Sequence, residues 1–280
     1  VYLHKNDHNK VLEISNSVLQ RIQDVDEKAL PSVMLDVYEV MGSVYESRKD
    51  AEKTLEMYTK GLEAATKYYG ENSPMAFRFS RLRTLFLHHS GPSHPKALQY
   101  AKNNLQIGLK GFSKDSGQVS SSYYLLGNFQ LFHGDGTEAL TSFKEALPFY
   151  EKYPQNDIET LEVIYIRFVQ IYNSLGDLKK VASFLAKADQ IDATCVKNKE
   201  SLAEKYFQWA QAIRNLKIQK TDQEEKAYYS KALELYKGLE PRNNARISEI
   251  YRNLGLLAFG GQDWSKAYEL LKECEKIANE

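Results

Sequence analysis

The sequence predicts an all-α fold, an α-solenoid built from antiparallel helix pairs, and three observations predict it. Residues at one equivalent position recur with intervals of 43, 42, 42, 44 and 42 residues; they are Gly42, Leu85, Gly127, Val169, Ile213 and Gly255. Apolar residues follow helical spacing, and no stretch alternates with the period of two that is typical of a strand. Short and long connections alternate along the chain. Repeats of this kind bury their apolar faces only against their neighbours, which gives a solenoid.

The clearest repeat covers residues 123–146, with the sequence YYLLGNFQLFHGDGTEALTSFKEA. Residues 134–136, Gly-Asp-Gly, are a turn signal between two amphipathic segments. Small side chains at Gly127 and Ala139, twelve positions apart, let the two predicted helices approach closely, and Phe143 fills the space beside them.

This repeat resembles the tetratricopeptide repeat (TPR), whose first helix reads large-x-x-Leu-Gly-x-x-Tyr and whose second reads Ala-x-x-x-Phe-x-x-Ala. The period of about 42 residues, together with YGENSPMA at residues 69–76, is similar to the long repeats of the kinesin light chain type. The resemblance implies a right-handed TPR superhelix that is not an enzyme. It also implies a groove, lined by the first helices, that takes up a partner peptide or helix.

The period divides the chain into a partial repeat followed by six complete ones. In the partial repeat, we expect a turn at Asn6-Asp7 and a helix over residues 10–22. The second complete repeat fits least well, because Leu85 replaces the small residue and residues 88–95 form a long connection rich in turn formers. The expected boundaries are 1–30 for the partial repeat and then 31–73, 74–115, 116–157, 158–199, 200–243 and 244–280.

The resemblance also indicates which side chains line the groove. The first repeat places acidic residues there, at Asp36, Glu39 and Glu46, and the later repeats place arginines and amides there. The predicted peptide-binding residues are Asn128, Arg167, Gln170, Asn173, Arg214, Arg252 and Asn253. Arginine offers a planar fork for carboxylates, and Asn or Gln can hydrogen-bond an extended peptide backbone, so we expect an acidic peptide ligand. The alternative is a solvated helix face whose charges form salt bridges with neighbouring helices.

Other chemistry-bearing residues give no sign of catalysis or of a cofactor. His88, His89 and His94 share one connection, but no Cys or carboxylate stands among them at ligand spacing, so we predict no metal. No phosphate-binding loop and no nucleophile-base set is present. Three aromatic residues, Phe86, Tyr124 and Phe259, are predicted to face the groove; most of the others fall at core positions.

Composition limits the class of partner. The 37 basic and 37 acidic residues balance, which argues against a general nucleic-acid binder. No apolar run is long enough to span a bilayer, and two cysteines form no disulfide framework, so we expect a cytoplasmic, cytoskeleton-associated protein without membrane insertion. The sequence has no initiating Met and starts within a motif, so we expect a piece of a longer protein. Its uncapped terminal repeats are candidates for self-association.

Two functions are compatible with these features. The first is a non-catalytic scaffold or adaptor that binds a partner peptide or helix, within a larger cytoskeletal or motor-associated protein. The second is a peptide-sensing regulatory domain that controls an attached effector module.

Overall fold

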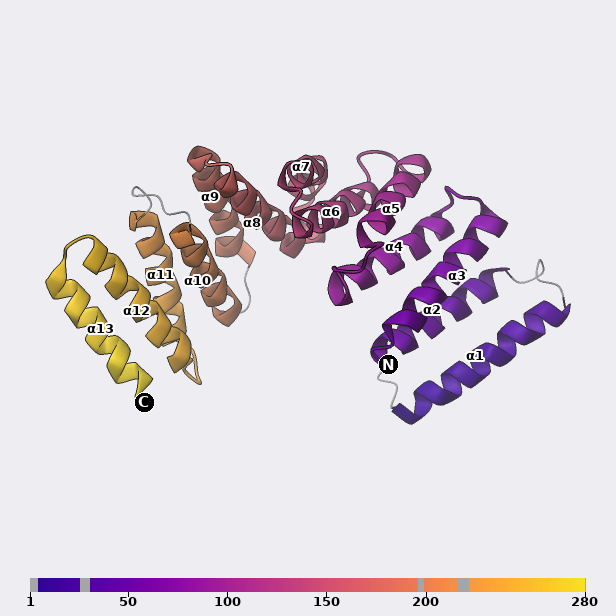
Figure 1. Ribbon diagram of the computed structural model, residues 1–280, viewed down its shortest axis with the longest axis horizontal. Coiled ribbons are helices and arrows are strands. Elements are labelled where there is room, and N and C mark those ends of the chain that lie inside the picture. Colours follow the sequence, from indigo (N-terminus) through magenta and orange to yellow (C-terminus); the bar gives the residue numbers. More distant parts are fainter. Residues whose placement is uncertain (1–4, 26–30, 196–198, 216–221, 280) are drawn as a thin grey trace. The chain divides into compact units, whose positions relative to one another are not determined.

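The predicted all-α class is confirmed by the computed structural model, which describes residues 5–25, 31–195, 199–215 and 222–279. These residues form helices and one short 3-10 turn, and they contain no strand. The two helices of each pair run in opposite directions (Figure 1). The contacts divide the chain into two compact units, Val1–Ile164 and Tyr165–Glu280.

The first unit consists of one leading helix and three helix pairs. Within each pair the two helices pack together, α2 on α3, α4 on α5 and α6 on α7, and the second helix of one pair packs on the first helix of the next. The helices are α1 (Lys5–Val25), α2 (Pro31–Ser47), α3 (Ala51–Tyr69), α4 (Pro74–Ser90), α5 (Ala97–Gly111), α6 (Gly117–Phe132) and α7 (Gly136–Lys152), followed by η1 (Pro154–Asn156).

The start of the chain differs from the expectation in one respect. The described part of α1 begins at Lys5 and passes through Asn6 and Asp7, so these residues lie in a helix rather than in a turn. Asn and Asp are common both in turns and in the first turn of a helix, and the local sequence does not separate the two cases.

Helix α8 (Ile158–Ser174) crosses the boundary between the units. The second unit continues with α9 (Leu178–Cys195), α10 (Lys199–Asn215), α11 (Asp222–Lys237), α12 (Asn244–Gly260) and α13 (Trp264–Ala278). Aromatic rings fill its interior: Phe168 of α8 stacks on Phe184 of α9 with ring centroids 4.5 Å apart, and Trp209 and Tyr229 are fully buried.

Four of the turns inside helix pairs share one geometry. In each, a residue with positive φ precedes an aspartate whose main-chain N–H donates to the carbonyl five residues earlier, which is the longer bond of a Schellman motif. The positive-φ residues are Lys49, Gly134, Gly176 and Gln262, with φ of 60°, 87°, 73° and 62°. The aspartates that follow them are Asp50, Asp135, Asp177 and Asp263. The side chains of Asp50, Asp177 and Asp263 also accept a hydrogen bond from the main chain three residues later, which caps the second helix.

The recurring small residue allows the two helices of a pair to approach closely, as the sequence predicts. A methyl group added at Gly127 would lie 2.8 Å from the ring of Phe143, and one at Gly42 would lie 2.3 Å from the ring of Tyr58. In the second repeat, Thr84 beside Leu85 is completely buried, and its hydroxyl donates to the Ser80 carbonyl at 2.7 Å.

The expectation that Phe86 faces the groove is wrong. Phe86 is 5% exposed and belongs to the core cluster that also contains Phe79 and Leu87. The apolar surface of α4 is broad, because Phe77, Phe79, Phe86 and Leu87 all face inward, and the repeat alignment alone did not fix the rotation of this helix. Phe259 is 55% exposed, and Tyr124 is half-buried against His88 and Phe143.

Candidate binding face

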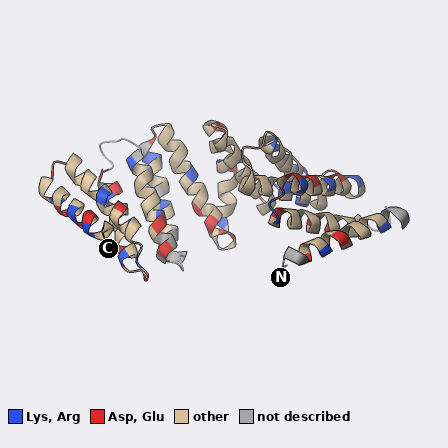
Figure 2. Cartoon of the chain, turned by 60° about the horizontal axis from the view of Figure 1, so that its bottom comes forward, with Lys and Arg blue, Asp and Glu red and all other residues tan. Residues whose placement is uncertain are grey.

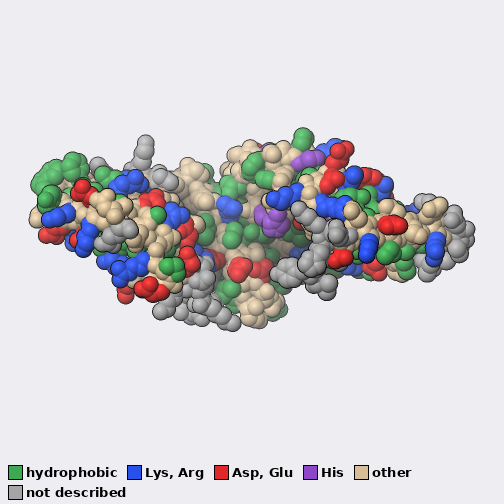
Figure 3. All heavy atoms as spheres, turned by 90° about the horizontal axis from the view of Figure 1, so that it is seen from below, with side chains coloured by type: hydrophobic (Ala, Val, Ile, Leu, Met, Phe, Trp, Pro, Cys, Tyr) green, Lys and Arg blue, Asp and Glu red, His purple; other side chains and the backbone are tan. Residues whose placement is uncertain are grey.

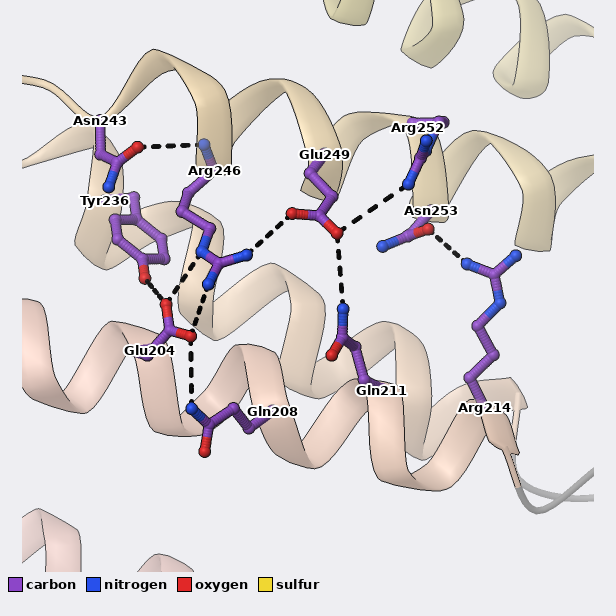
Figure 4. Close-up of polar contacts among 10 residues, drawn as sticks. All are labelled: Glu204, Gln208, Gln211, Arg214, Tyr236, Asn243, Arg246, Glu249, Arg252 and Asn253. Atoms are coloured by element: carbon purple, nitrogen blue, oxygen red, sulfur yellow. Dashed lines mark hydrogen bonds and ion pairs between the residues drawn. The ribbon is translucent and has the colours of Figure 1, made fainter. Parts of the chain in front are cut away.

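A row of polar side chains joins the first helices of the last two pairs, α10 and α12 (Figure 4). Along each helix, residues of the row recur three or four positions apart, and Arg252 and Asn253 are neighbours at its end on α12, so the row follows one side of each helix. We call this surface the α10–α12 face; it comprises Glu204, Gln208, Gln211 and Arg214 of α10 with Arg246, Glu249, Arg252 and Asn253 of α12.

Arg246 organises one end of the face. Its Nε donates to Glu204 Oε2 at 3.0 Å and its Nη2 donates to Glu204 Oε1 at 2.8 Å, while its Nη1 donates to Glu249 Oε2 at 2.9 Å. The hydroxyl of Tyr236 donates to Glu204 Oε2 at 2.6 Å. Burial and this contact with a carboxylate raise the pKa of Tyr236 above its usual range. The Asn243 side chain caps α12 by accepting a hydrogen bond from the main-chain N–H of Arg246 at 3.1 Å. The cap holds the main chain of Arg246 in place at the start of the helix.

Weaker contacts continue the row toward the other end. The Gln211 amide lies 3.5 Å from Glu249 Oε1, and an Arg252 nitrogen lies 3.9 Å from the same oxygen. Arg214 donates from Nη1 to Asn253 Oδ1 across the two helices. Asn253 is 2% exposed, whereas the Arg252 side chain is 59% exposed. Arg214 is also exposed. The guanidinium groups at this end therefore keep donors that face solvent.

A buried carboxyl group lies close enough to Arg214 to feel its charge. Glu225 of α11 is 4% exposed, and its Oε1 has no hydrogen-bond partner among the described residues. Burial raises the pKa of Glu225 to about 7, and the positive charge of Arg214 opposes that rise. Tyr229, one turn further along α11, has its pKa raised to about 12, first by burial and then by the charge of Glu225. The charge near Arg214 thus depends on pH around neutrality.

The structure brings together three of the predicted binding residues and separates the others. Arg214, Arg252 and Asn253 lie on the α10–α12 face. Arg167 and Gln170 share α8, where Arg167 Nη1 donates to Gln170 Oε1 at 3.0 Å.

The two remaining predicted residues, Asn173 and Asn128, belong to other helices than α10 and α12. Asn173 is half-buried one turn beyond Gln170 on α8. Asn128 belongs to the first unit, is 8% exposed and donates to the Tyr124 carbonyl at 3.0 Å.

Three charged residues of the face were missed by the sequence argument, which treated this region as basic. Glu204, Arg246 and Glu249 make the strongest contacts there, and the charges of both signs are interspersed over α10–α13 (Figure 2). A signal for them exists in the sequence: Glu204 and Arg246 carry opposite charges and stand 42 positions apart, one repeat period. In the first unit, the expected acidic residues Glu39 and Glu46 are likewise engaged, by Arg78 at 2.6 Å and by the Tyr58 hydroxyl at 3.1 Å.

The described part of the chain offers neither a metal site nor a membrane span. No group of three or more His, Cys, Asp or Glu side chains is arranged to hold a metal ion. Likewise, no described helix combines the length and the apolar character needed to cross a bilayer. His88 and His89 instead pack edge to face, with ring centroids 5.0 Å apart.

Solved structures resemble the chain over most of its length. A signal transduction ATPase with numerous domains (STAND) protein with a tetratricopeptide repeat sensor, from Pyrococcus horikoshii, matches with 16% identity and a TM-score of 0.66 over 97% of this chain, which spans 42% of that protein. The nearly identical TPR-like repeats of a putative kinesin light chain from Podosopora anserina match with 11% identity and a TM-score of 0.50, covering 89% of this chain and 95% of theirs. BtubC (BKLC) from P. vanneervenii matches with 12% identity and a TM-score of 0.51, covering 98% of this chain and 91% of its own. No family model and no curated protein sequence matches the chain.

Proposed function

We propose, for a chain that has the fold of tetratricopeptide-repeat proteins, that it is a non-catalytic interaction scaffold or adaptor. Its ligand is a peptide or helix of a partner protein, bound along the first helices of the repeats. The α10–α12 face is the main binding surface, and Arg167, Gln170 and Asn173 of α8 extend it within the second unit.

One observation carries this proposal: the α10–α12 face is closed by a bidentate ion pair at one end and open at the other. The bidentate contact between Arg246 and Glu204 fixes the two helices relative to each other. Arg214 and Arg252 remain exposed beyond it, held near Asn253 and Glu249. A pre-ordered surface loses little conformational entropy on binding, which favours recognition of a flexible peptide.

The exposed arginines favour an acidic ligand. Each guanidinium presents several donors in a plane that matches a carboxylate. Arg246 offsets part of the negative charge of Glu204 and Glu249, so the two carboxylates repel such a ligand less than free carboxylates would. We propose a cytoplasmic, cytoskeleton- or motor-associated setting, in line with the fold shared with the repeats of a putative kinesin light chain.

A second candidate function is a peptide-sensing regulatory domain within a larger protein. The similarity to a STAND protein that contains a tetratricopeptide repeat sensor favours it. In that case the same face would bind the peptide, and the bound peptide would change the arrangement of the repeats and so control an attached effector module.

Affinity capture from cell lysate, with mass spectrometry, tests the binding face. The full chain is compared with the double variant Arg214→Glu plus Arg252→Glu, and with Arg167→Glu as a separate arm. We expect the captured amount of each specific partner to fall at least tenfold with the double variant. Circular dichroism should show that the helix content of this variant is unchanged. A matched control, Lys231→Glu plus Lys237→Glu, reverses two exposed charges on α11 outside the face. Equal capture by the wild type and the double variant would show that this face is not the binding surface.

A further inference from the structure

A cavity of about 420 Å³ lies between α11, α12 and α13, away from the α10–α12 face. Its lining is largely apolar: Leu254, Leu257 and Ala258 come from α12, Leu233 from α11 and Leu270 from α13. Leu254 is 7% exposed and belongs to the core, whereas the other four are half-buried and leave apolar surface open to the cavity. This volume is within the range of sites that hold small ligands or single anchoring side chains.

The charges on the rim are ordered along the cavity. Helices α11 and α13 run in the same direction, so their N-terminal ends lie at the same end of the groove between them (Figure 1). Asp222 and Asp263 stand at that end, and Lys226 and Lys266 line the same cavity about 5 Å further along, one helical turn away. Within the described part of the chain, neither lysine takes part in an ion pair. One end of the rim is therefore acidic and the next turn is basic.

The order of its charges distinguishes this cavity from a larger one of about 580 Å³ in the first unit, whose lining is apolar to a similar degree. There the acidic residue Glu63 follows Lys60 along α3, so acidic and basic residues are not separated into two successive turns. The α12–α13 turn, whose Gly261 and Asp263 line the α11–α13 cavity, also exposes apolar surface: Phe259 and Trp264 pack edge to face there at 4.9 Å and are 55% and 59% exposed. Hydrophobic side chains gather at this end of the second unit (Figure 3).

We infer that this cavity, the α11–α13 site, is a second peptide-binding site. It takes one large apolar side chain of a partner protein, together with an acidic residue next to it and a basic residue beyond that. The apolar side chain enters among the leucines, the acidic residue lies beside Lys226 and Lys266, and the basic residue lies beside Asp222 and Asp263. The second helices α11 and α13 form its walls together with the side of α12 that bears Leu254, Leu257 and Ala258, so its existence does not depend on binding at the α10–α12 face.

Titration of the isotope-labelled full chain by NMR tests the inference with the probe peptide acetyl-Lys-Ala-Glu-Ala-Trp-amide, in which the order of charges and aromatic ring follows that of the cavity. We expect the main-chain signals of Ala258, Gly261 and Lys266 to shift in a saturable manner. Three control peptides separate the contributions: one with Ala in place of Trp, one with Lys at both charged positions and one with Glu at both charged positions. The mixed-charge Trp peptide should bind at least threefold more tightly than either same-charge peptide, and the Ala peptide should not saturate.

Two variants complete the test. Ala258→Trp fills the cavity and should weaken binding of the probe peptide at least tenfold. Ala227→Trp, on the exposed side of α11, should leave the affinity for the probe peptide unchanged. Lys226→Glu plus Lys266→Glu changes only exposed side chains and should make the peptide with Lys at both charged positions the tightest binder. The inference is overturned if the Ala and Trp peptides bind equally, if this charge swap leaves the order of affinities unchanged, or if the shifts map to Gln211 and Arg252 instead.

Discussion

Arg246 of α12 donates two parallel hydrogen bonds to Glu204 of α10, although the two residues are one repeat period apart in the sequence. The donor-acceptor distances are 3.0 Å and 2.8 Å, and the side chains are 35% and 31% exposed. The contact therefore connects one helix pair to the next at the surface, where the cores of the two pairs do not reach. Such contacts between neighbouring repeats are what make a solenoid cooperative.

The Arg246–Glu204 contact should carry a measurable coupling energy. A double-mutant cycle measures it from the urea unfolding of Arg246→Ala, Glu204→Ala and the double variant. We expect a coupling free energy of about 1 kcal/mol, because the pair is bidentate but its side chains are about a third exposed. Arg246→Lys should recover less than half of it, since an ammonium lacks the planar fork. The exposed pair Lys60–Glu56 at 2.6 Å, four residues apart on α3, serves as the control and should give at most about 0.5 kcal/mol. Equal coupling for the two pairs would contradict this prediction.

The buried carboxyl of Glu225 should make stability depend on pH near neutrality. Its pKa is about 7 in the folded protein against 4.5 for an ordinary Glu side chain, so the folded state binds this proton more tightly than the unfolded state. The stability contributed by this group is complete below about pH 4.5 and is lost as the pH rises to about 7. We expect the melting temperature of Glu225→Gln, relative to the wild type, to increase from pH 5 to pH 8.

A second variant links this effect to the binding face. Because Arg214 lowers the pKa of Glu225, Arg214→Gln should raise that pKa further and move the loss of stability to higher pH. Thermal unfolding followed by circular dichroism at pH 5, 6, 7 and 8 measures both effects. A constant difference between the Glu225→Gln variant and the wild type across this range would mean that the carboxyl titrates as it does in water.

The fold could be predicted from the sequence because its determinants are local and repeated. The 42-residue period and the small residue at Gly127 depend on contacts within one helix pair. Each repeat therefore shows the same sequence pattern independently of the others. The described helix pairs begin at Pro31, Pro74, Gly117, Ile158, Lys199 and Asn244.

The surface of the groove helices could be predicted only in part, because side-chain pairing joins residues far apart in sequence. Arg214, Arg252 and Asn253 lie together as an alignment of repeats suggests, but the contacts of Glu204 and Arg246 depend on how two neighbouring pairs are rotated. The same dependence explains Phe86, whose burial follows from the rotation of α4 rather than from its repeat position.

The close helix approach at Gly127 should make this position intolerant of a larger side chain. We expect Gly127→Val to destabilise the protein by about 1–3 kcal/mol, because its Cβ would lie 2.8 Å from the fully buried ring of Phe143. Gly136→Val is the matched control: a Cβ there meets nothing within 4 Å, and the expected change is within about 0.5 kcal/mol. Equal stability of the two variants in urea unfolding would show that α6 and α7 can separate without cost.

The four Schellman turns predict where the protein can be stabilised. Gly134 and Gly176 occupy the positive-φ position without strain, whereas Lys49 and Gln262 hold the same conformation with a side chain, at φ of 60° and 62°. Replacing either with glycine relieves that strain but increases the entropy of the unfolded chain, so we expect Lys49→Gly and Gln262→Gly each to gain about 0.5–1 kcal/mol in urea unfolding. The reverse change, Gly176→Ala, should lose about 1 kcal/mol for the same reason.

Lys49 and Gln262 are far apart in the chain and lie in different units, so the gains should add in the double variant. A loss of stability on Lys49→Gly would mean that its side chain contributes more through contacts, such as those around Asp50, than the turn costs in strain.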